Sequence, residues 1–345
     1  MHIPDNYLSV STCLTLAAAT VPVWTRSIKT VARDFPRERF SALGVAAAFS
    51  FLAMMFNVPL PGGTTGHAVG GTLLAALLGP EAACLALSIA LLLQALLFGD
   101  GGVLAFGANC FNIAFILPFS GYYSYLLFRR LLGSSAGVRN YVALALGSYL
   151  GINVAALVAG VEFGLQPLLF HNAEGQALYC PYPLGVATAA MAVGHLTVFG
   201  LAEVVFTLAS YAFIERTSPQ FATNPALTQS DDGYTARSTR SRFNAIYLGI
   251  ALLVLATPLG LLAEGTAWGE WGTDEIAEVV VDGQPLGYTP EGMTNGFQWN
   301  ALVPDYAAPG MPEWLSYILS AIAGVACSII IFKLLALCLR RPKLA

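Results

Sequence analysis

Long hydrophobic runs alternate along this chain with short polar segments, and most runs are as long as a helix that crosses a bilayer. Such a helix needs about 17–25 largely apolar residues. The pattern predicts nine membrane spans, near residues 8–25, 41–58, 68–80, 82–98, 103–128, 138–161, 184–214, 244–263 and 314–339. The third run is short and rich in glycine, which predicts a half-span or a broken helix. With an odd number of crossings, we expect the two termini on opposite sides of the membrane.

The composition supports the same fold class. Of the 345 residues, 56% are hydrophobic and only 10% are charged, whereas about a quarter of the residues in a soluble domain are charged. We therefore expect an all-α polytopic membrane protein, surrounded by lipid and without a nucleic-acid partner. The six cysteines form no CxxC pair, so neither a disulfide framework nor a thiolate zinc site is predicted.

The basic residues predict the orientation, because cytoplasmic loops collect lysine and arginine. All 16 of them fall on one side of the nine-span arrangement. The amino terminus is therefore expected outside and the carboxyl terminus in the cytoplasm. The outward segments are acidic, notably between Glu264 and Glu313, and such a surface attracts cations.

The amino terminus itself is a candidate metal chelator. The chain begins Met1-His2-Ile3-Pro4-Asp5, and the Met1 amine, the His2 amide nitrogen and the nearer His2 ring nitrogen can close two chelate rings around one ion. Nitrogen ligands in a plane suit Ni(II) or Cu(II) and can accommodate Co(II). The alternative is that His2 is one polar residue of a frayed terminus. No basic segment or cleavage pattern of a signal peptide is found here, so we expect this terminus to remain in place.

A second unusual stretch runs from Pro59 to Gly71, with two prolines and five glycines in thirteen residues. Such a stretch cannot form an ordinary membrane helix, and irregular backbone at membrane depth requires a protein or polar cavity around it. It carries one imidazole, that of His67. A lone histidine is often a hydrogen-bonded structural residue. Because the predicted topology puts His67 on the same side as His2, we favour a shared metal site.

Three motifs together resemble the CbiM/NikM family. They are His2-Ile3-Pro4-Asp5, the glycine-rich loop with Thr65-Gly66-His67, and the stretch from Gln94 through Asp100-Gly101-Gly102 to Asn112. The resemblance covers residues 1–215 and implies a bundle of about seven helices. Members of this family are the substrate-binding S components of prokaryotic energy-coupling-factor importers for cobalt and nickel. Asn6-Tyr7 departs from the usual glycine and aromatic residue. The Gly-Thr-Thr-Gly-His form resembles the nickel branch.

The resemblance implies a near-square-planar site with four nitrogen ligands: the Met1 amine, the His2 amide, the His2 imidazole and the His67 imidazole. The ion is the transported Ni²⁺ or Co²⁺, and no resident cofactor is implied. Binding would release protons, so affinity should fall on acidification. Zn(II) would be disfavoured by geometry, whereas Cu(II) would bind more tightly than Ni(II).

Other polar residues are candidates for supporting roles. The possible outer-sphere partners of the ligands are Thr65, Gln94, Asp100, Asn109 and Asn112. Alternatives are a tight turn at Asp100 and hydrogen bonding between helices at the two asparagines. His195 and Glu203 in the seventh span are suspect as intramembrane ionisable groups. His171 reads as a surface residue.

A change of composition divides the chain. We expect a metal-binding membrane domain at residues 1–214, a polar cytoplasmic linker at 215–243, and a two-helix module at 244–345 with an outer loop at 264–313. This module, with Trp268-Gly269-Glu270-Trp271, resembles the accessory component CbiN or NikN, here fused to the binding component. Its tryptophans could instead form an interfacial aromatic belt.

The sequence contains no phosphate-binding loop of the form GxxxxGK[ST], so the chain is not expected to be an ATPase. The resemblance implies a CbiQ/NikQ-like membrane coupling protein and a CbiO/NikO-like ATPase as partners. A proton-coupled permease is the main alternative and would need ionisable groups along a path through the bilayer. An intramembrane hydrolase or a metal sensor lacks the motifs it would require. ATP-driven import of nickel or cobalt, with nickel favoured, is the best reading.

Overall fold

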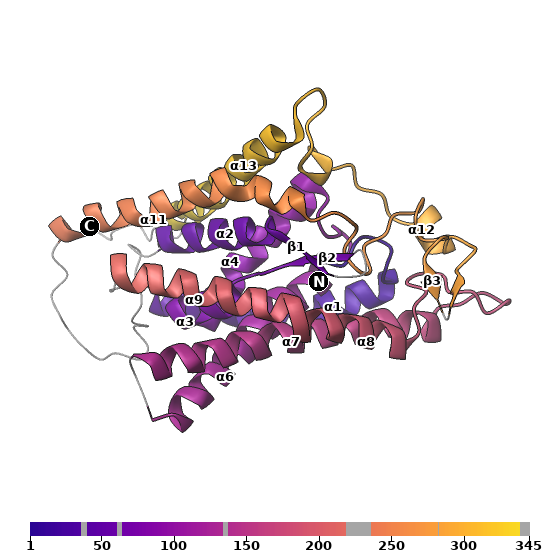
Figure 1. Ribbon diagram of the computed structural model, residues 1–345, viewed down its shortest axis with the longest axis horizontal. Helices are drawn as coiled ribbons and strands as arrows, with labels where there is room; N and C mark the ends of the chain where they lie inside the picture. Colours follow the sequence, from indigo (N-terminus) through magenta and orange to yellow (C-terminus); the bar gives the residue numbers. More distant parts are fainter. Residues whose placement is uncertain (36–39, 61–63, 134–136, 219–235, 282, 339–345) are drawn as a thin grey trace.

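The computed structural model describes residues 1–35, 40–60, 64–133, 137–218, 236–281 and 283–338. Most of these residues are helical, and the long helices lie side by side along one direction of the molecule (Figure 1). The strands in this part of the chain are short and form two-stranded hairpins. The prediction of an all-α polytopic membrane protein is confirmed.

The helices follow the hydrophobic runs. They are α1 (Val10–Asp34), α2 (Phe40–Met54), α3 (Gly71–Leu78), α4 (Pro80–Leu93), α5 (Phe106–Asn109), α6 (Leu117–Leu131), α7 (Val138–Leu169), α8 (Leu184–Gly194), α9 (Gly200–Thr217), α11 (Ala236–Ala256), α12 (Glu291–Asn295) and α13 (Glu313–Cys338). Turns of π-helix over Gln94–Phe98, Cys110–Ile116 and His195–Phe199 extend α4, join α5 to α6 and join α8 to α9. Short 3₁₀ helices occupy Thr257–Leu262 and Pro304–Tyr306.

Six helical segments are long and apolar enough to cross a membrane. They are Pro80–Phe98, Phe106–Leu131, Val138–Leu169, Leu184–Thr217, Ala245–Leu262 and Glu313–Cys338. The other three predicted spans differ: α1 has 25 residues with several threonines and serines, α2 has 15 residues, and α3 has 8 residues. At about 1.5 Å per residue, α3 is too short to cross alone, as its glycines predicted.

The glycine-rich stretch forms a β-hairpin rather than an open loop. Strand β1 (Asn57–Leu60) pairs antiparallel with β2 (Thr64–His67), and Asn57 lies opposite His67. The second predicted span therefore ends at Met54, because the chain becomes extended shortly after it. Residues 61–63, including two of the five glycines, lie outside the described part.

A buried carboxylate fixes the start of α3. The backbone N–H groups of Val69 and Gly70 donate to the Glu203 carboxylate of α9, at 2.7 Å for Val69 and 3.0 Å for the shorter Gly70 bond. A negative charge at a helix amino terminus is favourable, since the free N–H groups and the helix dipole point there. Gly70 has φ 74°, a conformation that glycine adopts without strain. Glu203 thus ties the hairpin to α9.

The carboxyl-terminal helices pack on the rest of the bundle through small residues. A Cβ on Gly44 of α2 would lie 3.0 Å from the Ile329 Cα of α13, and a Cβ on Gly324 would touch the Phe51 ring. Glycine at such contacts lets membrane helices approach closely. The segment between α11 and α13, with α12, β3 (Val280–Val281) and β4 (Gln284–Pro285), covers the end of the bundle opposite the marked carboxyl terminus (Figure 1). Most of the predicted linker lies outside the described residues.

Candidate metal centre

The amino terminus is buried inside the bundle, beside β2 (Figure 1). His2 is only 2% exposed and Met1 8%. Ile3 is held on both sides of its peptide: its N–H donates to Asn109 Oδ1 at 2.7 Å, and its carbonyl accepts from Asn109 Nδ2 at 3.0 Å. This terminus is fixed by specific hydrogen bonds, unlike a frayed one.

Asp5 anchors the turn that follows. Its carboxylate accepts hydrogen bonds from the backbone N–H groups of Val103, Leu104 and Ala105 at 2.7–3.2 Å, just before α5. Burial raises the pKa of Asp5, although these three donors favour the ionised form. A Cβ at Gly102 would collide with the Asp5 carboxylate, so glycine is required there. The terminal motif and the glycine-aspartate stretch, far apart in sequence, therefore form one unit.

His2 and His67 come together at this terminus. Their ring centroids are 5.0 Å apart, with the ring planes inclined by 41°. His67 Nδ1 lies 3.1 Å from the Ala68 carbonyl oxygen, which fixes the proton on Nδ1 and leaves Nε2 as a free ligand atom. Burial, aided by the nearby positive charges of His2 and the terminal amine, lowers the pKa of His67 to about 3. Its imidazole is therefore neutral at physiological pH, which is the form that binds metals.

Asp100 connects His2 to two further side chains. Asp100 Oδ1 lies 2.5 Å from His2 Nδ1, and Oδ2 accepts from Gln94 Nε2 at 3.0 Å and from the Tyr306 hydroxyl at 2.5 Å. Although burial opposes ionisation, His2, His67 and the Tyr306 hydroxyl hold the pKa of Asp100 below its usual value. A carboxylate bound to a ligating imidazole orients the ring. Here it holds Nδ1, the ring nitrogen that the predicted chelate uses, and His2 Nε2 has no hydrogen-bond partner.

The segment between α11 and α13 supplies two residues that sequence reasoning missed, Glu270 and Tyr306. Glu270 Oε1 lies 3.8 Å from the Met1 amino nitrogen, and burial raises the pKa of this carboxyl group while the terminal amine opposes the rise. Tyr306 stacks on Phe98 with ring centroids 4.6 Å apart. The backbone of Tyr306 is left-handed, with φ 61°, a conformation costly for a bulky residue. The available signal was the Trp268–Trp271 motif, which contains Glu270 but gives no partner for it.

The remaining candidates divide between this cluster and other places. Thr65 donates to the Gly265 carbonyl at 3.3 Å, beside the cluster, while Asn112 donates to Glu162 of α7 at 2.6 Å. Gln94, Asp100 and Asn109 belong to the cluster. Glu162 was expected just beyond the sixth span, but α7 continues to Leu169 and carries it inside the helix. The structure thus gathers all the predicted ligands and four of the five supporting residues.

The donor set of this cluster consists mainly of nitrogen atoms. Within the described residues, no group of three or more His, Cys, Asp or Glu side chains is placed to hold a metal ion, and the cysteines of this part are unpaired thiols. A metal bound here would therefore require the terminal amine and backbone nitrogen beside the two imidazoles. Such a set favours planar Ni(II) or Cu(II) over Ca²⁺ or Mg²⁺.

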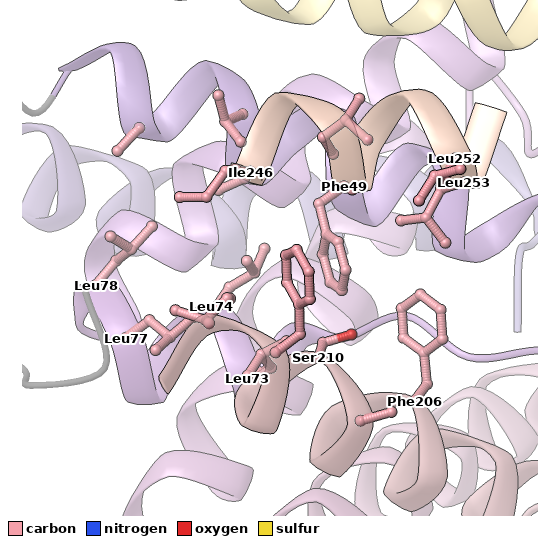
Figure 2. Close-up of a pocket in the computed structure, with 18 of the residues that line it drawn as sticks. Phe49, Leu73, Leu74, Leu77, Leu78, Phe206, Ser210, Ile246, Leu252 and Leu253 are labelled. Atoms are coloured by element: carbon pink, nitrogen blue, oxygen red, sulfur yellow. The ribbon is translucent and has the colours of Figure 1, made fainter. Parts of the chain in front are cut away.

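A separate cavity of about 540 Å³ lies between α2, α3, α9 and α11 and has a different character. Figure 2 shows Phe49, Leu73, Phe206 and their neighbours around it, with Ser210 contributing one hydroxyl. Its other described lining residues are hydrophobic. A cation would lose its hydration there without compensation, so this cavity is no metal site.

The fold and this cluster define a polytopic helical membrane protein whose amino terminus is buried beside a second imidazole and a carboxylate. The sequence model described as "Cobalt uptake substrate-specific transmembrane region", CbiM, matches residues 2–221, and the PDGLE domain model matches residues 242–341. The chain belongs to the CbiM family. The predicted resemblance, with a fused CbiN-like segment, is confirmed.

Relatives share both parts of the chain. It is 50% identical over 335 residues to a "Probable fused nickel transport protein LarMN" of Lactiplantibacillus plantarum, covering 96% of this chain and 97% of that protein. It is 46% identical over 338 residues to a "Fused nickel transport protein NikMN" of Rhodobacter capsulatus, covering 94% of each. A solved structure titled "Crystal Structure of an Truncated Transition metal Transporter" is 51% identical with a TM-score of 0.59, over 63% of this chain and 99% of that one.

Proposed function

We propose that this chain is the substrate-binding membrane component of an ATP-driven energy-coupling-factor importer of Ni(II) or Co(II), with nickel favoured. The observation that carries the proposal is the convergence of the Met1 amine, His2 and His67 in a buried cluster next to Asp100. Family membership supports a role in metal transport, and the fused relatives named as nickel transport proteins support nickel.

The proposed loaded state differs from the present one in defined ways. The Met1 ammonium and the His2 amide each lose a proton, and the His2 ring turns about its Cβ–Cγ bond so that Nδ1 leaves Asp100 and faces the ion. A divalent ion with one deprotonated amide and three neutral donors has net charge +1. The ionised Asp100 compensates that charge, which a buried centre requires. His67 Nε2 supplies the fourth nitrogen.

The energy source and the orientation also belong to the proposal. We expect a CbiQ/NikQ-like coupling protein and a CbiO/NikO-like ATPase as partners, with the amino terminus outside, the carboxyl terminus in the cytoplasm, and the chain in a prokaryotic cell membrane. The division at residues 214 and 244 is part of the same proposal. The proton-coupled permease is less favoured because Glu203 is engaged by the backbone of α3 and His195 Nδ1 by the Met191 carbonyl.

The test combines binding and transport. Purified protein loaded with Ni(II), Co(II) or Cu(II) should show one tightly bound ion and the d–d absorption of a planar nitrogen site. His67→Ala should abolish that absorption and the uptake of radioactive nickel in cells that also express the coupling protein and the ATPase. The matched control is His171→Ala, in a surface loop. Undiminished uptake by His67→Ala, or uptake without the ATPase, would refute the proposal.

A further inference from the structure

A second cavity, of about 530 Å³, lies directly beside the amino terminus. Met1 lines it, together with Thr64 and Thr65 of the hairpin, His195 and Phe199 of the π-helical turn, and Trp268 of the carboxyl-terminal module. It therefore joins the proposed ligand Met1 to groups from three distant parts of the chain. Unlike the apolar cavity of Figure 2, it contains an imidazole and two hydroxyl groups.

The hydrogen bond of His195 defines what its ring presents. Nδ1 lies 2.8 Å from the Met191 carbonyl oxygen, and a carbonyl only accepts, so the proton is on Nδ1. Nε2 then carries a lone pair, and no hydrogen bond to it occurs among the described residues. A histidine whose Nδ1–H is held by a backbone carbonyl is in the arrangement typical of a metal ligand. The ring is 6% exposed and packs edge-on against Phe199 at 5.3 Å.

Thr64 gives an independent indication of a polar occupant. Its hydroxyl oxygen is buried without a hydrogen-bond partner, and Thr64 lines the same cavity as His195. A buried polar atom left unpaired costs free energy of about 1–3 kcal/mol. Such groups usually have a partner that is water or a ligand. The hydroxyl and the imidazole can together receive a partly hydrated cation, the imidazole by coordination and the hydroxyl through a bound water.

We propose that this cavity is the vestibule through which the metal ion exchanges with the four-nitrogen site, and that His195 Nε2 binds the ion in transit. This inference rests on the proposed function. The ligand is a divalent transition-metal ion that keeps part of its water shell. Neutral imidazole suits Ni(II) and Co(II), and the neighbouring Met1 amine is the next nitrogen donor along the wall. His195 thus acts on the rate of exchange and leaves the affinity of the final site unchanged.

The experiment measures binding and rate separately in the purified full chain. Loading is followed by the d–d absorption after rapid mixing with Ni(II), and release by mixing with an excess of chelator. His195→Gln should slow both by about tenfold or more, by analogy with the loss of other metal-supporting residues, while the bound Ni(II) at equilibrium stays at one per chain. Ala190→Phe, which fills the cavity from α8, should slow both in the same way, and His171→Ala should change neither.

A second readout does not depend on rates. At excess Co(II), the wild-type chain should bind a second, weaker ion with the spectrum of a hydrated imidazole complex, and His195→Gln should lack it. Unchanged loading and release in both His195→Gln and Ala190→Phe, with normal equilibrium binding, would overturn the vestibule and leave the proposed function intact. A wild-type chain that retains neither Ni(II) nor Co(II) would overturn the proposed function itself.

Discussion

The contact between Asp100 and Tyr306 makes the most demanding prediction, because it reaches the metal centre from the carboxyl-terminal module. Tyr306→Phe removes one hydrogen bond to an ionised carboxylate, worth about 1.5–3 kcal/mol. If Asp100 positions His2 and compensates the charge of the ion, most of this loss appears in metal binding. At tenfold per about 1.4 kcal/mol, the Kd for Ni(II) should rise about ten- to hundredfold.

Asp100→Asn should have an effect at least as large. The amide cannot accept from both Gln94 and Tyr306 while also serving His2, since its nitrogen is a donor. Because the residues form one network, the double variant Asp100→Asn/Tyr306→Phe should lose less affinity than the sum of the single losses. The assay is competition of the purified variants with a chelator of known affinity.

The matched control is Tyr317→Phe. Tyr317 is also buried, packs against Tyr306 with ring centroids 5.4 Å apart, and donates to the Met55 carbonyl at 2.9 Å. It makes no printed hydrogen bond to Asp100, so its loss should lower stability but leave the Kd unchanged. An unchanged Kd in Tyr306→Phe, or equal effects of the two tyrosine changes, would refute the positioning role of Tyr306.

Three further predictions concern protons, the hairpin and the helix contact. Because the pKa of His67 is lowered to about 3, this imidazole stays neutral between pH 8 and 5, and acid weakens binding through the Met1 amine and the His2 amide; with two protons released per ion, the Kd measured by titration should rise by up to about a hundredfold per pH unit, and a pH-independent Kd would exclude this donor set. Glu203→Ala should destabilise the protein by about 1–3 kcal/mol, because two backbone N–H groups lose their acceptor; thermal unfolding in detergent measures it, and an unchanged melting temperature would contradict the capping role. Gly324→Leu should separate α13 from α2, because even a Cβ there meets the Phe51 ring, and proteolysis of the segment between α11 and α13 should accelerate; Gly185→Leu, where a Cβ meets nothing, is the control, and equal proteolysis of both would argue against the contact.

Local patterns predicted the helices well and their ends less well. Hydrophobic runs of about twenty residues are required wherever lipid surrounds a helix, and all nine predicted runs correspond to helices. The ends depend on contacts that the pattern does not contain. The second run stops at Met54 because β1 pairs with β2, and the sixth reaches Leu169, which places Glu162 beside Asn112.

The placement of the two asparagines shows the same limit. Asn109 and Asn112 are three residues apart, a spacing that puts two side chains on one face of an α-helix. A π-helical stretch begins at Cys110 and changes this periodicity. Asn109 consequently holds Ile3, while Asn112 meets α7.

The sequence by itself determined the class of protein, the broken third span and the three residues proposed as metal ligands, because hydrophobicity, glycine content and the chemistry of a terminal histidine are local properties. Only the tertiary structure decided which residues surround those ligands. Asp100 meets Tyr306 and Met1 meets Glu270 across more than two hundred residues. The physical reason is that a buried charge is satisfied by whichever partner the packing brings near, and no local pattern records that partner.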